Sequence, residues 1–282
     1  MKLGKTMFVV LCAAVLLAAV SPAQAQEAAA PDRSREKVKV DPDGAPPPIP
    51  VAEIIRQFAA KEADFRVARG NYTYTQTVRV EEFSQYGDAG GQFQRTSEVI
   101  FTPEGKRYER ITREPPTTLR LVSMSLEDLK DLENIQPFVL TTEELPKYEL
   151  EYLGRQQIDE IGAYVFGVKP RKIEANQRYF QGTVWVDDHD LQIVKSYGKA
   201  VPDIQKKGHE NLFPMFETWR ENIDGKYWFP TLTRADDVLR FKGGDVRIKM
   251  TVRYANYKQF KSTIRILSSE PVKPEEKKPP QP

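Results

Sequence analysis

Alternation of apolar and polar residues constrains the fold of this chain more than any other feature. Within residues 178–202, Val184 and Val186 alternate with Thr183 and Trp185, and the polar sequence Asp-Asp-His-Asp then interrupts the pattern before apolar residues resume. Successive side chains of a strand point to opposite faces, and Asp favours turns. The segment therefore predicts a β-hairpin.

Similar alternation recurs along most of the chain. The stretch from Val246 to Tyr254 places apolar residues at every second position, with Arg, Lys and Thr between them. One buried face and one solvent-exposed face are typical of antiparallel sheets. We expect about eleven strands, with no repeated βαβ pattern, and a sheet this wide must curl.

Two helices interrupt the strand pattern. Apolar residues from Val51 to Phe65 fall at three- and four-residue steps and predict an amphipathic helix that ends at Gly70, with Glu62 near the edge of its apolar stripe. Ser125 and Asp128 resemble a capping arrangement at the start of a second, short helix. The predicted fold class is mainly β (α+β): a curved antiparallel sheet, an incomplete β-barrel, over the N-terminal helix.

Other segments are predicted as follows. Residues 87–91 form a loop, residues 117–124 form a strand, and residues 202–212 form a polar connection.

The first residues predict a secretory signal peptide. Lys2 and Lys5 precede an apolar run, and an A-x-A arrangement predicts cleavage after Ala25. A retained anchor is the alternative, but the run is shorter than the ~20 residues of a spanning helix. The sole cysteine, Cys12, follows Leu11 rather than a small residue, which argues against a lipid anchor. The exported chain then has no cysteine, and the expected compartment is the periplasm.

The predicted organisation is a signal peptide over 1–25, a Pro-containing flexible linker over 26–50, one domain over 51–267 and a disordered tail over 268–282. Without the signal peptide the chain carries 40 basic and 40 acidic residues. This balance gives no electrostatic reason to expect nucleic acid as a partner. We expect a monomer.

The order of these parts resembles the LolA-like superfamily, which includes outer-membrane lipoprotein-sorting proteins. The resemblance covers residues 51–260 and is carried by YTYTQTVRVE at 72–81, GTVWVDDHDLQIVKS at 182–196 and DGKYWFP at 224–230. It implies a half-barrel covered by helices, whose apolar interior holds lipid or lipoprotein acyl chains. The arginine of that family's cavity cannot be placed on a matching motif here.

The resemblance implies a periplasmic carrier that helps to move acyl chains to the outer membrane. It does not imply an enzyme, and we expect no cofactor and no metal. The expected ligand-binding residues are apolar and aromatic: Ile54, Ile55, Phe58, Phe65, Tyr72, Tyr74, Tyr108, Tyr164, Phe166, Trp185, Phe216, Trp219 and Phe229.

Three alternatives stay open. The first is an envelope sensor or interaction module that binds a protein partner. The second is a periplasmic hydrolase with Glu217 or Asp188 as a catalytic carboxylate, although G-x-S-x-G, H-E-x-x-H and glycine-rich phosphate motifs are missing from the sequence. The third is a metal site at Asp187–Asp190, which we interpret instead as a hairpin turn because adjacent turn residues rarely converge on one ion. Six strand carboxylates alternate with apolar residues, and most of them are expected to face water: Glu98, Glu109, Glu149, Glu151, Glu217 and Glu221.

Overall fold

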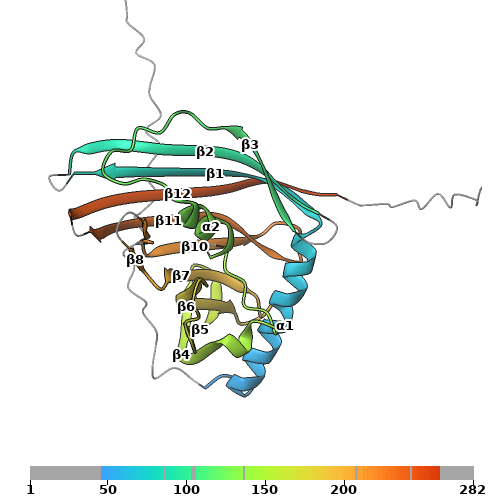
Figure 1. Cartoon of the computed structure of the whole chain (residues 1–282). Coiled ribbons are helices and arrows are strands. Elements are labelled where there is room, and N and C mark those ends of the chain that lie inside the picture. The colour runs from blue at the N-terminus through green and yellow to red at the C-terminus, as the bar shows by residue number, and fades with distance from the viewer. Residues whose placement is uncertain are drawn as a thin grey trace, which may run out of the picture.

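Ten strands form one open antiparallel sheet, and both helices lie on the same side of it (Figure 1). The computed structural model describes residues 46–84, 87–102, 106–135, 137–206, 209–211, 213–241 and 243–260. The predicted signal peptide, most of the predicted linker and the predicted tail lie outside these ranges.

The strands run in the order β3-β2-β1-β12-β11-β10-β7-β6-β5-β4, so the first and last strands in chain order, β1 and β12, pair with each other inside the sheet. Their directions turn progressively from β2 to β4 in Figure 1, and the edge strands β3 and β4 do not pair with each other. The bounds of the sheet strands are β1 Tyr72–Phe83, β2 Ala89–Phe101, β3 Arg107–Arg113, β4 Tyr148–Ile158, β5 Ile161–Pro170, β6 Tyr179–Asp187, β7 Ile193–Val201, β10 Phe216–Asn222, β11 Trp228–Phe241 and β12 Gly244–Gln259.

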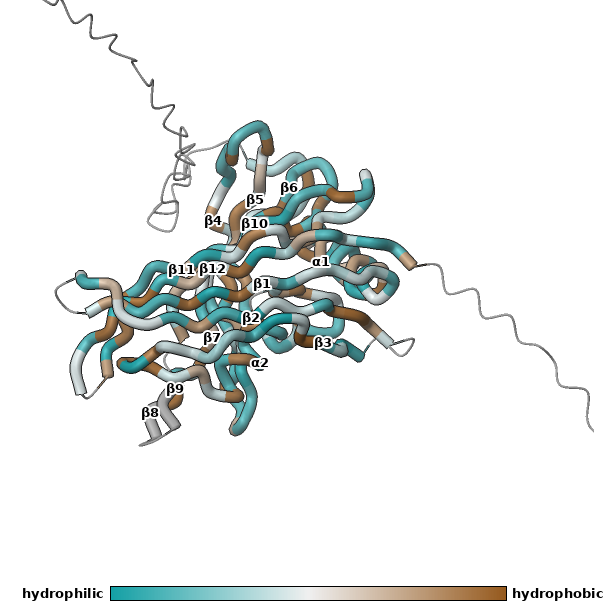
Figure 2. The backbone as a smooth tube through the Cα atoms, turned by 90° about the horizontal axis from the view of Figure 1, so that it is seen from above, coloured by the Kyte–Doolittle hydropathy of each residue, from teal (hydrophilic) through white to brown (hydrophobic). Residues whose placement is uncertain are grey.

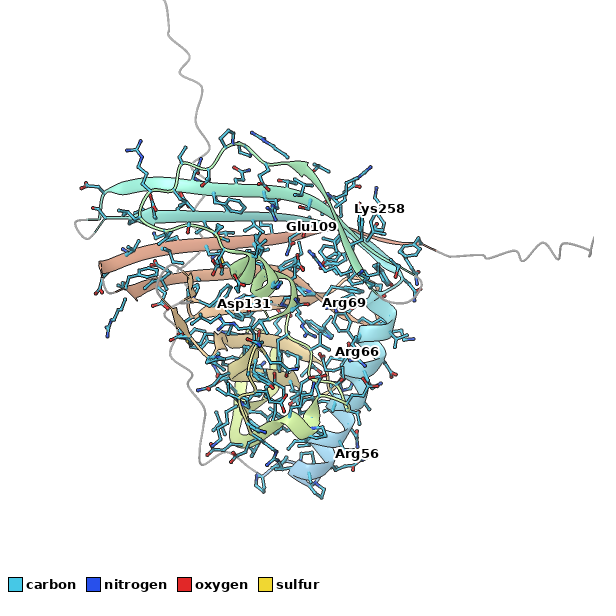
Figure 3. The ribbon with its side chains drawn as sticks, in the orientation of Figure 1. Arg56, Arg66, Arg69, Glu109, Asp131 and Lys258 are labelled. Carbon is cyan, nitrogen blue, oxygen red and sulfur yellow. The ribbon has the colours of Figure 1, made fainter. Side chains whose placement is uncertain are left out.

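Helix α1 (Val51–Arg69) crosses the sheet near one end of its strands, and Arg56, Arg66 and Arg69 mark its course in Figure 3. Phe58 packs against Phe166 of β5 with ring centroids 5.5 Å apart. Helix α2 (Leu126–Asn134) begins at Ser125 with a complete capping box, and a short 3₁₀ turn, η2, covers Leu145–Lys147. The predicted fold class is confirmed.

The sheet has two distinct faces, and apolar and polar residues alternate along its strands (Figure 2). The inner face carries the main core, in which Val184 and Val186 pack with residues of α1 and α2. Trp185, between them, belongs to a separate apolar cluster on the outer face. Successive residues of the predicted hairpin therefore do point to opposite faces, as expected. Both faces of this part of the sheet nevertheless bury apolar side chains.

Several local predictions need correction. The described part contains twelve strands rather than about eleven, because residues 202–212, predicted as a polar connection, include a separate small hairpin, β8 (Ile204–Lys206) with β9 (His209–Asn211). The predicted loop at 87–91 is shorter, since β2 begins at Ala89. Residues 117–124 form no strand; a side chain of β1 binds their backbone N–H groups instead.

Candidate functional site

A cavity of about 710 Å³ lies on the inner face, at the end of the sheet away from α1, and we call it the inner cavity. Strands β1, β11 and β12 form one wall, while α2 and the segment before it form the other. Most of the lining side chains are apolar: Val80, Leu121, Val122, Met124, Leu132, Phe213, Pro214, Leu239, Phe241, Val246, Ile248 and Met250. Ser84, Ser123, Ser125, Asp128 and Asp245 add polar groups.

The segment 119–125, here called the strap, covers one side of the inner cavity. Its backbone is held by the carboxylate of Glu82, which is 1% exposed and accepts hydrogen bonds from the N–H groups of Arg120 (2.7 Å), Leu121 (2.8 Å) and Val122 (3.1 Å). Gly91 N–H donates a fourth bond, at 3.0 Å. A buried carboxylate needs such donors, because an unsatisfied charge in the interior is costly.

These bonds also set the ionisation of Glu82. Burial pushes the pKa of Glu82 upward, but the four backbone N–H groups outweigh that effect and hold its pKa below the ordinary value. The strap is therefore tied to an ionised carboxylate. This explains why residues 117–124 do not continue as a strand: their donors are used by a side chain.

Two glycines of β2 make room for the strap. A Cβ on Gly91 would lie 1.8 Å from the carbonyl oxygen of Thr118, and one on Gly90 would lie 2.8 Å from Cγ of Glu82. Neither distance is compatible with a side chain. The Gly-Gly pair thus lets the strap lie directly on β2 and on the carboxylate below it.

An ion pair and an N-terminal cap fix the position of helix α2. Asp131, which is 1% exposed, pairs with Arg178 at 2.6 Å, and the aspartate is labelled on α2 in Figure 3. Ser125 Oγ accepts a hydrogen bond from Asp128 N–H at 3.1 Å to cap the helix. Leu132 is buried in the core and lines the inner cavity, whereas Leu126 of the same helix is 71% exposed. The helix therefore presents apolar side chains both to the cavity and to solvent.

The end of the inner face beneath α1 is filled by the chain's own side chains. Phe65 packs edge-on to Phe229 with centroids 5.3 Å apart. Glu62, predicted near the edge of the apolar stripe, is instead fully buried at its centre and pairs with Arg220 at 3.0 Å. Arg220 also donates to the carbonyl of Phe138, and Glu62 accepts from Ile193 N–H. This buried pair fastens α1 to the sheet.

The structure separates the predicted ligand-binding residues into three groups. Most pack in the core beneath or beside α1: Ile54, Ile55, Phe58, Phe65, Tyr72, Tyr74, Tyr164, Phe166, Phe216 and Phe229. Tyr108 of edge strand β3 is 62% exposed. Trp185 and Trp219 lie on the outer face. The inner cavity is lined by other residues, and the alternation of residues along the strands does not indicate which ones they are. The Leu-Val-Ser-Met run at 121–124, after Pro115-Pro116, was a signal in the sequence for part of this lining.

The Asp-Asp-His-Asp sequence forms the predicted hairpin turn. Asp187 Oδ1 accepts hydrogen bonds from the N–H groups of His189 (2.8 Å) and Asp190 (2.5 Å), and Leu191 adopts a φ of 54°. Asp188 pairs with Arg155. Within the described ranges no group of three or more His, Cys, Asp or Glu residues is placed to hold a metal ion.

Two of the six strand carboxylates do not face water. Glu217 is 1% exposed and pairs with Lys195 at 2.7 Å, and Glu109 pairs with Arg107 at 2.9 Å with its side chain 16% exposed. Lys195 comes from β7, the strand adjacent to β10, whereas Arg107 lies two residues from Glu109 on β3 itself. Strand alternation alone does not reveal the partner of Glu217, because that pairing depends on which strands are adjacent.

No family model matches the sequence, and a search of curated proteins finds no match. Among solved structures, a DUF1329 family protein from Desulfovibrio piger aligns with a TM-score of 0.40 and 16% identity, covering 74% of this chain and 93% of that one. A LolA superfamily protein from Nitrosomonas europaea gives 0.34 and 13%, with coverages of 76% and 95%. A predicted outer membrane lipoprotein-sorting protein domain from Vibrio parahaemolyticus gives 0.33 and 12%, with 72% and 93%.

These neighbours include the superfamily that the sequence resembles. Their TM-scores and identities are low, so we base the functional proposals on the side chains of this chain. In the part of the chain that the structure describes, none of the helices is both long enough and apolar enough to span a membrane.

Proposed function

We propose that this protein is a periplasmic carrier that binds the acyl chains of a lipid or lipoprotein in the inner cavity and helps to move them to the outer membrane. The observation that carries the proposal is the inner cavity itself, a largely apolar space of about 710 Å³ closed on one side by a tied strap. At about 30 Å³ per water-sized group, this space suits one long acyl chain.

The energetics favour such a ligand. Burying hydrocarbon is worth about 0.8 kcal/mol per methylene, so a chain of a dozen methylenes gains on the order of 10 kcal/mol before the entropic costs of binding. Leu121, which lines the inner cavity and is 51% exposed, would contact the hydrocarbon during entry. An exposed leucine in the lining gives an apolar chain a first contact as it leaves water.

A matched pair of variants tests the proposal. Leu239 lines the inner cavity, whereas its neighbour Val238 is 45% exposed. In Leu239→Trp the indole should displace two or three methylenes of the ligand, costing about 2 kcal/mol. A fluorescent fatty acyl probe should then bind more than tenfold more weakly, while Val238→Trp should leave its affinity unchanged. Lipid that co-purifies with the wild type should be detected by mass spectrometry and depleted in Leu239→Trp. Equal probe affinity in both variants would refute the site.

A second candidate function is an envelope interaction module. The observation that favours it is edge strand β3, on which Tyr108 and Ile111 are 62% and 50% exposed. Exposed strand edges can accept a partner strand. Pull-downs from envelope extracts with Ile111→Lys, and with residues 268–282 deleted, would test it: a stoichiometric partner lost in either variant supports this function, and retention in both argues against it.

A further inference from the structure

A second pocket lies on the outer face, and two of the chain's three tryptophans line it. The sequence has three tryptophans, and Trp185, Trp219 and Trp228 all belong to the apolar cluster on this face. A space of about 370 Å³, here called the outer pocket, is lined by Trp219 and Trp228 together with Ile158 and Ile161 at the tip of the β4–β5 hairpin. Its volume is within the ~300–1,000 Å³ range of small-ligand sites.

The outer pocket contains a buried carboxylate whose second oxygen has no hydrogen-bond donor. Glu217 is 1% exposed; its Oε1 pairs with Lys195 Nζ at 2.7 Å, and its Oε2 is buried and accepts no hydrogen bond from the described part of the chain. Glu217 lines the pocket. Buried polar atoms are almost always satisfied, and an unsatisfied one costs about 1–3 kcal/mol. A ligand that donates a hydrogen bond to Glu217 Oε2 would satisfy this oxygen.

The surrounding charges indicate what kind of donor fits. Lys195 Nζ already neutralises Glu217 and lies 4.7 Å and 4.3 Å from the ring centroids of Trp185 and Trp219. A ligand ammonium at Oε2 would therefore approach another buried ammonium, and like charges repel strongly in such surroundings. A neutral hydroxyl satisfies the oxygen without that repulsion.

The remaining groups extend this chemistry. Arg234 lies directly across the strand pair from Glu217 and supplies donors, while Glu221, which accepts from Thr231 Oγ1 at 3.1 Å, supplies acceptors. Indoles combine a flat apolar face with weak attraction for C–H groups. We propose that the outer pocket binds a neutral sugar ring, with a hydroxyl donating to Glu217 Oε2 and the ring's C–H face lying on Trp228.

This proposal does not depend on the carrier function, because the two sites lie on opposite faces of the sheet. Ligand binding at the outer pocket can be measured directly. All three tryptophans lie in one cluster on this face, so intrinsic tryptophan emission reports on the outer pocket. The full chain should be titrated with glucose, N-acetylglucosamine and their β-1,4-linked disaccharides, with methylammonium as a cationic competitor.

We expect at least one sugar to change the emission saturably. Trp228→Ala removes a half-buried wall, and Glu217→Gln removes the charged acceptor; each should weaken sugar binding about tenfold or more. Glu98→Gln, at an exposed carboxylate of β2, is the matched control and should bind normally. All three variants should give the same far-UV circular dichroism spectrum as the wild type, which shows that they are folded.

Glu217→Gln leaves Lys195 buried without its carboxylate and can fail to fold; Trp228→Ala then carries the test. No emission change with any sugar would overturn the proposal. Unchanged sugar affinity in Trp228→Ala would do the same, and so would binding of methylammonium in preference to sugars.

Discussion

Replacing Glu82 with glutamine should release the strap without unfolding the sheet. The carboxylate accepts four backbone N–H bonds, from Gly91, Arg120, Leu121 and Val122. A carboxamide keeps one accepting oxygen, which can satisfy about two of these donors. Losing two hydrogen bonds to a charged group, at about 1.5 kcal/mol each, should lower the free energy of local opening of the strap by about 3 kcal/mol.

The assay is amide hydrogen exchange. A loss of about 3 kcal/mol should accelerate exchange at Leu121 and Val122 roughly 100-fold, while the amides of β6 and β7 keep their protection. Glu81→Gln is the control, since Glu81 lies beside Glu82 on β1 and makes an ordinary pair with Arg79 at 2.8 Å. Unchanged exchange in the strap of Glu82→Gln, or equal acceleration throughout the protein, would refute the idea that this carboxylate is a local latch.

The same latch should respond to acid. Because the folded-state pKa of Glu82 is depressed, its stabilising contribution is fully present above its unfolded value and is lost as pH falls through the folded value. The difference in amide exchange at Leu121 and Val122 between wild type and Glu82→Gln should therefore shrink below about pH 4. A difference that stays constant through that range would contradict the assignment.

Two further predictions concern packing. Glu62→Gln leaves the guanidinium of Arg220 buried without a carboxylate and should lower the free energy of unfolding by about 3–5 kcal/mol in denaturant titrations, whereas replacing both residues with methionine should cost less; equal losses would contradict this account of the pair. Gly91→Ala would place a methyl group 1.8 Å from Thr118 O, so the strap should lose exchange protection, while Gly243→Ala, with open space around it, should have no effect.

The main outline of the fold could be predicted from residue patterns. Alternation at Val184–Val186 and Val246–Tyr254, and the helical spacing from Val51 to Phe65, reflect local geometry, since the faces of a strand or helix follow directly from its repeat. The capping box at Ser125 likewise needs only neighbouring residues. These predictions are confirmed because each feature depends only on residues that are close together in the sequence.

The candidate sites could not be predicted in this way. The interaction of Glu82 with the strap joins residues 38 to 40 positions apart, and that of Glu62 with Arg220 joins residues 158 apart. A carboxylate at an alternating position can face solvent or be buried against a cation, and the sequence pattern is the same in both cases. Strand order decides between them.

The sequence by itself determined that this is a chain of many antiparallel strands with a leading amphipathic helix, because hydrophobic periodicity is set residue by residue. Only the tertiary structure decided where space remains. Helix α1 fills one end of the inner face, leaving the inner cavity beneath a strap tied to Glu82, and cross-strand pairing places Trp185 and Trp219 next to Lys195 on the outer face. Both arrangements depend on contacts between distant residues, and a linear pattern of apolar residues does not specify which distant segments meet.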